Sequence, residues 1–155
     1  MVTVDLLEPT PSKPEQSIAL IRDRIMPLYM RFWQDIIQDT YGKPFNPHIQ
    51  LFLEMWFTNG LRFILAKDGQ SPVGFATCIL FRPMQYQARV LQVSDFYDAR
   101  RADVAKALIE YIETLAKMLN CDELWFDQHN ITSAAFSSKW MEQAPMGMRR
   151  YTRME

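Results

Sequence analysis

The sequence has few of the residues from which metal sites and disulfide frameworks are built. Among its 155 residues are only two cysteines, Cys78 and Cys121, and two histidines, His48 and His129. Cys78 lies within an apolar run, and we expect both thiols to be buried, in a protein of a reducing compartment, rather than paired in a disulfide. Because no Cys or His stands at ligand spacing from another, the sequence predicts no metal site.

An excess of charge and a long apolar run are missing as well. The formal net charge is −1, which argues against a protein that binds nucleic acid or anionic membranes through summed basic charge. No apolar run reaches the roughly 18 residues that a membrane span requires. The start, "MVTVDLLEPTPSKPEQ", lacks a basic segment followed by a hydrophobic one. We therefore predict a cytoplasmic protein with no specific nucleic-acid partner and no membrane partner.

Apolar residues make up 48% of the chain, enough for one core, and we predict a single domain over residues 1–155. Alternation and turn residues predict strands, and apolar spacings of three and four predict helices. In chain order these are a strand at 2–7, a helical segment within 17–42 in which Pro27 kinks the helix or begins a second one, a helix at 46–57, a hairpin at 62–83, a strand at 88–97, a helix over 104–119, a strand at 122–127, a helix at 131–144 and a final edge strand within 147–155. This order predicts an α/β (α+β) fold with a mixed central sheet flanked by helices.

The strand that ends at residue 97 leads almost directly into a helix through "DARRADVA", which begins at Asp98. The first N–H groups of a helix lack partners within it, and the peptide dipoles add positive potential there, so such a junction can hold a pyrophosphate. The junction can also be a plain helix start, in which the Asp103 carboxylate accepts hydrogen bonds from those N–H groups. The sequence leaves both interpretations open.

The element order and two motifs resemble the GNAT family, the Gcn5-related N-acetyltransferases. The family's acetyl-CoA loop reads Arg/Gln-x-x-Gly-x-Gly/Ala, and "RRADVAK" places Arg100 at the Arg, or Arg101 if the register shifts by one. A later helix of the family reads Asn-x-x-Ala-x-x-Leu-Tyr-x-Lys, and "NITSAAFSSK" supplies Asn130 and Lys139 in register. For an active member the resemblance implies acetyl-CoA as cofactor, held by residues of the central strand, the loop and the later helix: Val93, Arg100, Arg101, Asp103, Val104, Ala105, Lys106 and Asn130.

The departures from these motifs bear on function. Asp103 stands where the family has its first Gly, and a carboxylate about 4 Å from a phosphate charge repels it by roughly 4 kcal/mol at an effective dielectric of about 20. Ser137 stands where the family often has the Tyr that protonates the leaving thiolate, and a serine hydroxyl is a poor general acid. The catalytic candidates are then Ser137 as the acid and Asp95, or Asp98, at the end of the central strand as the base. Each Asp can instead be a turn or capping residue.

Because both the glycine and the tyrosine are replaced, the sequence favours a GNAT-fold protein with a degraded acetyl-CoA site. Such a protein would be a non-catalytic or weakly catalytic binding or structural component, with a protein partner or self-assembly. By analogy with small GNAT-like proteins of tailed bacteriophages, it would be phage-encoded and act in the virion or the host cytoplasm. The alternatives are an active acetyl-CoA-dependent N-acetyltransferase that acylates an amine of a small molecule or protein, and a host-directed inhibitor.

Overall fold

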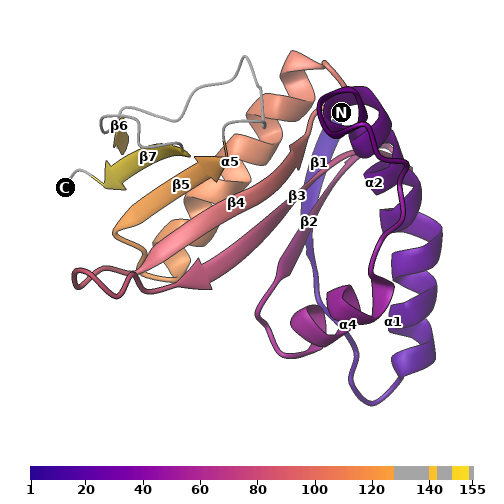
Figure 1. Cartoon of the computed structure of the whole chain (residues 1–155), viewed down its shortest axis with the longest axis horizontal. Coiled ribbons are helices and arrows are strands. Elements are labelled where there is room, and N and C mark those ends of the chain that lie inside the picture. The colour runs from indigo at the N-terminus through magenta and orange to yellow at the C-terminus, as the bar shows by residue number, and fades with distance from the viewer. Residues whose placement is uncertain (128–139, 143–147, 154–155) are drawn as a thin grey trace.

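The structure is a computed structural model of the chain, and it describes residues 1–127, 140–142 and 148–153. Seven strands form one sheet in the order β1-β2-β3-β4-β5-β7-β6 (Figure 1). Within the described ranges only β4 and β5 run parallel, so the sheet is mixed, as the sequence predicts. The strands are β1 Val2–Leu7, β2 Arg62–Asp68, β3 Ser71–Phe81, β4 Val90–Tyr97, β5 Glu123–Asp127, β6 Trp140–Glu142 and β7 Met148–Arg153.

The hairpin of β2 and β3 lies inside the sheet, between β1 and β4, and both of its faces are buried. Its turn contains Gly69 at φ 61°, a left-handed conformation that glycine adopts without strain. Along β2 the side chains alternate between the two faces, so that Ile64 belongs to one apolar cluster and Leu65 to another. Both are fully buried, which requires helices on both sides of the sheet.

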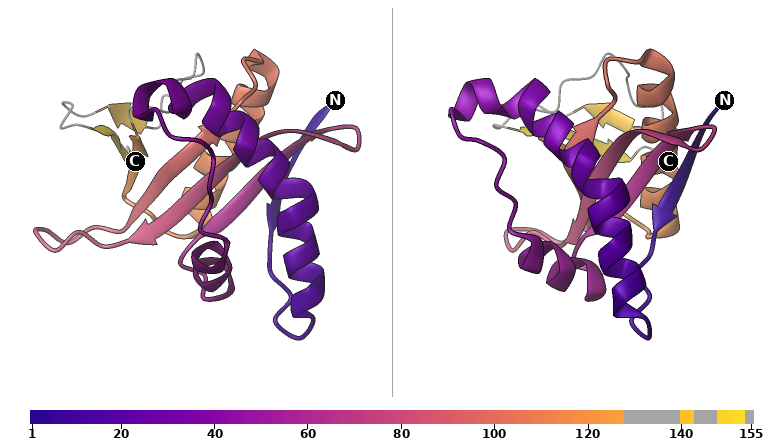
Figure 2. Two further views of the ribbon diagram at one scale, coloured as in Figure 1. Left: turned by 45° about the vertical axis from the view of Figure 1, so that its right-hand side comes forward. Right: turned by 90° about the vertical axis from the view of Figure 1, so that its right-hand side faces the viewer.

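The long helix α5 (Ala102–Met118) covers one of these faces (Figure 2). The predicted apolar positions Val104, Leu108, Ile112 and Leu115 are all buried, and they pack against side chains of the central strands that include Ile64 and Leu91. The spacing of three and four residues places these side chains on a single stripe of the helix. The helix predicted from the sequence is therefore confirmed.

The opposite face is covered by a continuous helical segment and by α4 (Ile49–Phe57). The segment runs without a break because its boundary residues are right-handed helical. The sequence predicted that Pro27 kinks the helix or begins a second one, and in the structure Pro27 stands at the start of α2. It lies in the first turn of α2, directly after the π-helical turn η1, where its missing N–H matters least. The parts of the segment are α1 Pro14–Leu20, η1 Ile21–Ile25, α2 Met26–Phe32, η2 Trp33–Ile37 and α3 Gln38–Tyr41.

Two expectations for the C-terminal part are wrong. Trp140–Glu142, the end of the predicted helix at 131–144, forms strand β6. The final strand β7 lies between β5 and β6, so it is not an edge strand. The rest of the predicted helix lies outside the described residues.

Both thiols are buried, as the sequence predicts, and neither forms a disulfide. Burial raises the pKa of Cys78 to about 12 and that of Cys121 to about 11. None of the helices in the described ranges has the length and apolar character that a membrane span requires. The same ranges contain no group of His, Cys, Asp and Glu side chains arranged to hold a metal ion.

Candidate functional site

Strand β4 carries an irregularity beside its last pair with β5 in the described ranges. That pair is Val93↔Phe126, and β4 continues to Tyr97. On its other side β4 pairs with β3, and there the register shifts: Thr77 lies opposite Asp95, and Cys78 opposite Val93. Such a bulge bends a strand and redirects the side chains next to it. Here it directs Asp95 toward the helical segment that covers this face.

Asp95 accepts hydrogen bonds from two hydroxyl groups. The Tyr29 hydroxyl of α2 donates to Asp95 Oδ2 at 2.6 Å, and the Thr77 hydroxyl of β3 donates to the same oxygen at 2.8 Å. The Asp95 N–H in turn donates to Thr77 Oγ1 at 3.0 Å. Burial raises the pKa of Tyr29 well above its usual value, and the charge of Asp95 raises it further. The Tyr29 hydroxyl therefore stays protonated at every physiological pH and keeps its hydrogen bond to Asp95.

Asp95 lines a cavity of about 390 Å³, which we call the aromatic pocket. The rings of Trp33 and Tyr41 stack at a centroid distance of 6.2 Å and an interplanar angle of 15°. The Trp33 indole N–H donates to the Lys43 carbonyl at 2.7 Å, which joins the loop after α3 to the π-helical turn η2. Turns of this kind are frequent at functional sites. The lining consists of Tyr29, Phe32, Trp33, Ile37, Tyr41, Lys43 and Asp95.

The turn between β4 and α5 has an unusual backbone. Ala99 and Arg100 follow one another with φ values of 52° and 59°, a conformation that costs of the order of 1–2 kcal/mol per non-glycine residue. Hydrogen bonds within the turn hold it: the Arg100 N–H donates to Asp98 Oδ1, and the Arg101 N–H donates to the Asp98 carbonyl, each at 2.9 Å. Asp98 is thus a turn residue, as one interpretation of the sequence predicted.

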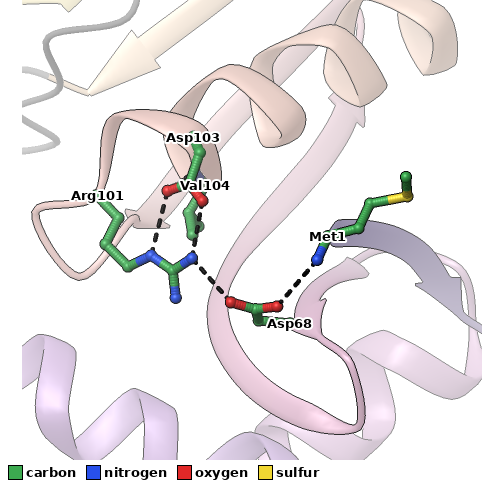
Figure 3. A network of polar contacts seen from close by, with 5 residues as sticks. All are labelled: Met1, Asp68, Arg101, Asp103 and Val104. Carbon is green, nitrogen blue, oxygen red and sulfur yellow. Dashed lines mark hydrogen bonds and ion pairs between the residues drawn. The ribbon is translucent and has the colours of Figure 1, made fainter.

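Arg101 is the centre of a polar network at the start of α5 (Figure 3). Its guanidinium donates to both oxygens of Asp103, at 3.1 and 2.7 Å, and to Asp68 of the β2–β3 turn at 3.0 Å. The terminal amino group of Met1 lies 3.2 Å from the other oxygen of Asp68. The hydrogen bonds from Arg101 lower the pKa values of Asp103 and Asp68. Both carboxylates are therefore ionised at neutral pH.

This network reduces the repulsion that Asp103 would exert on a phosphate. The predicted repulsion of a phosphate assumed an unpaired carboxylate, but Arg101 neutralises Asp103 through two hydrogen bonds, which makes it far less repulsive. Asp103 also accepts from the Val104 N–H at 3.0 Å, in agreement with the capping interpretation. By contrast, no carboxylate among the described residues forms an ion pair with the exposed Arg100, which sits at the motif position in the preferred register.

The other residues proposed for cofactor binding divide by exposure. The side chains of Val93, Val104 and Ala105 are buried in the core, so that only their backbone atoms can meet a ligand. Lys106 is exposed on α5. Asn130 and the candidate acid Ser137 lie outside the described residues.

Asp95 is a candidate from the sequence alone, but its neighbours Tyr29, Thr77 and Trp33 are not. The aromatic density of the N-terminal helices was visible. Nothing in the sequence, however, links a tyrosine in a helix to an aspartate 66 positions later in a strand. A sequence signal for the β4 bulge is equally absent, because Ser94 looks like any other strand residue.

The fold places the chain among α/β proteins with a mixed sheet covered by helices on both faces, and comparison with known proteins identifies its family. The profile of the Acetyltransferase (GNAT) family matches residues 23–141. The chain therefore belongs to the GNAT family, whose members use acetyl-CoA. A search of curated protein sequences gave no significant match.

Solved structures with the same fold are distant in sequence. An aminoglycoside acetyltransferase from an uncultured soil metagenomic sample is 16% identical, with a TM-score of 0.61 over 86% of this chain and 82% of that one. A predicted acetyltransferase with acetyl-CoA from Clostridium acetobutylicum is 15% identical, with a TM-score of 0.57 over 93% and 96%. A ribosomal-protein-alanine N-acetyltransferase from Brucella melitensis biovar Abortus 2308 is 21% identical, with a TM-score of 0.57 over 78% and 75%. At these identities the likeness shows the fold alone. The comparisons give no support to a phage origin or a virion role.

Proposed function

We propose that this protein is an acetyl-CoA-dependent N-acetyltransferase that acylates a primary amine, rather than a non-catalytic component with a degraded site. The observation that carries the proposal is the position of Asp95. It lies at the β4 bulge, near the last β4–β5 pair of the described residues, and it lines the aromatic pocket. A carboxylate held by two hydroxyl donors in a largely apolar cavity is a suitable anchor and proton acceptor for an amine.

The chain has residues that fit acetyl-CoA. At the start of α5, the helix dipole and the cations Arg100 and Arg101 favour a pyrophosphate. With Asp103 paired to Arg101, the exposed guanidinium of Arg100 is the main positive charge for that group. Bound there, acetyl-CoA would supply an acyl group activated as a thioester.

Asp95 would accept a proton from the amine and pass it to solvent. An ammonium that becomes an amide loses two protons as its nitrogen forms the C–N bond and the C–S bond of the thioester breaks. One proton ends on the sulfur, and Asp95 passes the other to solvent, so that atoms and charge balance. Tyr29 and Thr77 hold the carboxylate in place through the hydrogen bonds to Oδ2. They are positioning residues in this scheme.

The test combines ligand binding with turnover. Thermal unfolding is followed with and without excess acetyl-CoA, and thiol release is followed with a panel of primary amines. A ligand at about 100 times its dissociation constant adds roughly 2.7 kcal/mol to the free energy of unfolding, so the midpoint should rise by several degrees. Asp95→Asn should lower kcat/KM roughly 100- to 10,000-fold and leave the shift caused by acetyl-CoA intact.

Asp23→Asn is the matched control. Asp23 is an exposed acid that pairs with Arg22 on η1 and does not line the aromatic pocket, so the same chemical change there should leave turnover unaltered. Absence of any acetyl-CoA shift at millimolar concentration would refute the proposal. The binding component with a protein partner would then be the better reading.

A further inference from the structure

The aromatic pocket also carries information about the acceptor. Its volume of about 390 Å³ is near the small end of the range for ligand sites, roughly 300–1,000 Å³. Its walls are mainly aromatic rings, and these rings pack on one another and on the core behind them. Tyr29 packs on Phe75 at a centroid distance of 5.2 Å and meets Phe32 edge to face at 5.9 Å. The walls are therefore formed before any ligand arrives, and they suit a flat apolar group.

The charges of the pocket limit the acceptor further. Among the described residues, Asp95 is the only acidic side chain in the lining, and Lys43 is the only basic one. One carboxylate in the lining matches one ammonium on the ligand. A second ammonium on the same ligand would be repelled by Lys43, whereas aromatic faces such as that of Trp33 suit an uncharged ring.

From these features we infer that the acceptor is a small primary amine with an aromatic body and one positive charge, and that polyamines and aminoglycosides are poor ligands. The inference rests on the proposed function, because it names the substrate class of the same site. The ammonium lies at Asp95, where its nitrogen is acylated, and the ring lies against Trp33 and Tyr41. Tyr41 is 60% exposed, so the part of the ligand's ring that lies against Tyr41 remains open to solvent.

Binding of the amine alone tests the inference without acetyl-CoA. Isothermal titration compares 2-phenylethylamine with 2-phenylethanol, which keeps the ring but lacks the charge, and with spermidine and kanamycin, which carry several charges and no aromatic ring. We expect 2-phenylethylamine to bind at least about 10-fold more tightly than each of the other three, as charge-assisted hydrogen bonds and ring stacking predict.

Variants assign this preference to residues. Trp33→Leu should weaken 2-phenylethylamine roughly 3- to 30-fold, and Trp33→Phe should restore most of the loss, because it restores an aromatic face. Lys43→Gln should reduce the difference between the dissociation constants of spermidine and 2-phenylethylamine. Asp95→Asn should lower the affinity for 2-phenylethylamine to that for 2-phenylethanol. Circular dichroism checks that each variant is folded.

The outcomes separate the inference from the proposed function. Equal binding of the amine and the alcohol, tighter binding of spermidine or kanamycin, or no effect of Trp33→Leu would overturn the inference. Thiol release with a polycation or a peptide but not with 2-phenylethylamine would overturn it as well, while the proposed acetyltransferase stands. Selective binding of 2-phenylethylamine without any acetyl-CoA binding would support the inferred ligand class and refute the enzyme.

Discussion

Gly74 lies where β3 passes closest to the turn between β4 and α5, and its replacement by alanine should disturb that turn. A Cβ atom at this position would lie 2.5 Å from the Tyr97 carbonyl oxygen and 2.7 Å from Val104 Cγ1. Tyr97 ends β4, and Val104 lies in the first turn of α5. Because one of these contacts is backbone, relief requires that the strand end and the helix start move apart. Overpacking of this kind costs about 1–3 kcal/mol.

For a domain of this size, each kcal/mol shifts the unfolding midpoint by about 2–4 °C, so Gly74→Ala should lower it by roughly 2–12 °C. The turn that would hold the pyrophosphate moves with the helix start, and we therefore also expect a smaller stabilisation by acetyl-CoA. Differential scanning calorimetry with and without acetyl-CoA measures both effects.

Gly60→Ala is the control for Gly74→Ala. Its Cβ would lie 3.5 Å from the nearest atom, an ordinary contact, and its φ is outside the left-handed region. This variant should keep the midpoint within about 2 °C, as surface changes usually do. A Gly74→Ala protein as stable as the wild type, with unchanged acetyl-CoA binding, would refute the close approach of β3 to the turn.

Three further predictions concern charges and thiols. Arg101→Ala should weaken acetyl-CoA binding more than about tenfold in isothermal titration, because it removes a cation and exposes the charge of Asp103; Asp103→Asn in the same background should recover part of the loss, and simple additivity would contradict the pairing. Burial raises the pKa of Tyr97 to about 12, above its value of about 10 in the unfolded chain. The protonated Tyr97 hydroxyl therefore contributes at most about 2–3 kcal/mol to the free energy of unfolding. This contribution is complete below pH 10 and is lost as the pH rises toward 12. In urea titrations Tyr97→Phe should reduce this alkaline loss of stability, and an unchanged loss would contradict the prediction. The thiols of Cys78 and Cys121 should react with Ellman's reagent only on unfolding, and fast reaction of the native protein would show that they are accessible.

Local patterns in the sequence were sufficient for most of the fold. The apolar stripe of α5 and the turn at Gly69 follow from residues close together in the chain, since helical periodicity and turn conformation are local properties. The family resemblance rested on the same local features, and it located the turn at Arg100 and the candidate base Asp95. The π-helical turns η1 and η2 were not predicted, because such turns have no sequence pattern of their own.

The functional meaning of these residues was decided by tertiary contacts. The sequence presented Asp103 as an unpaired negative charge, but the fold brings Arg101 together with both Asp103 and Asp68, the latter 33 positions away. Asp95 became a site residue only because a bulge in β4 turns it toward Tyr29 and the aromatic pocket. Electrostatic and hydrogen-bond energies depend on distances between groups that the chain keeps far apart. Those distances are set by strand register and by helix packing, which no single segment encodes.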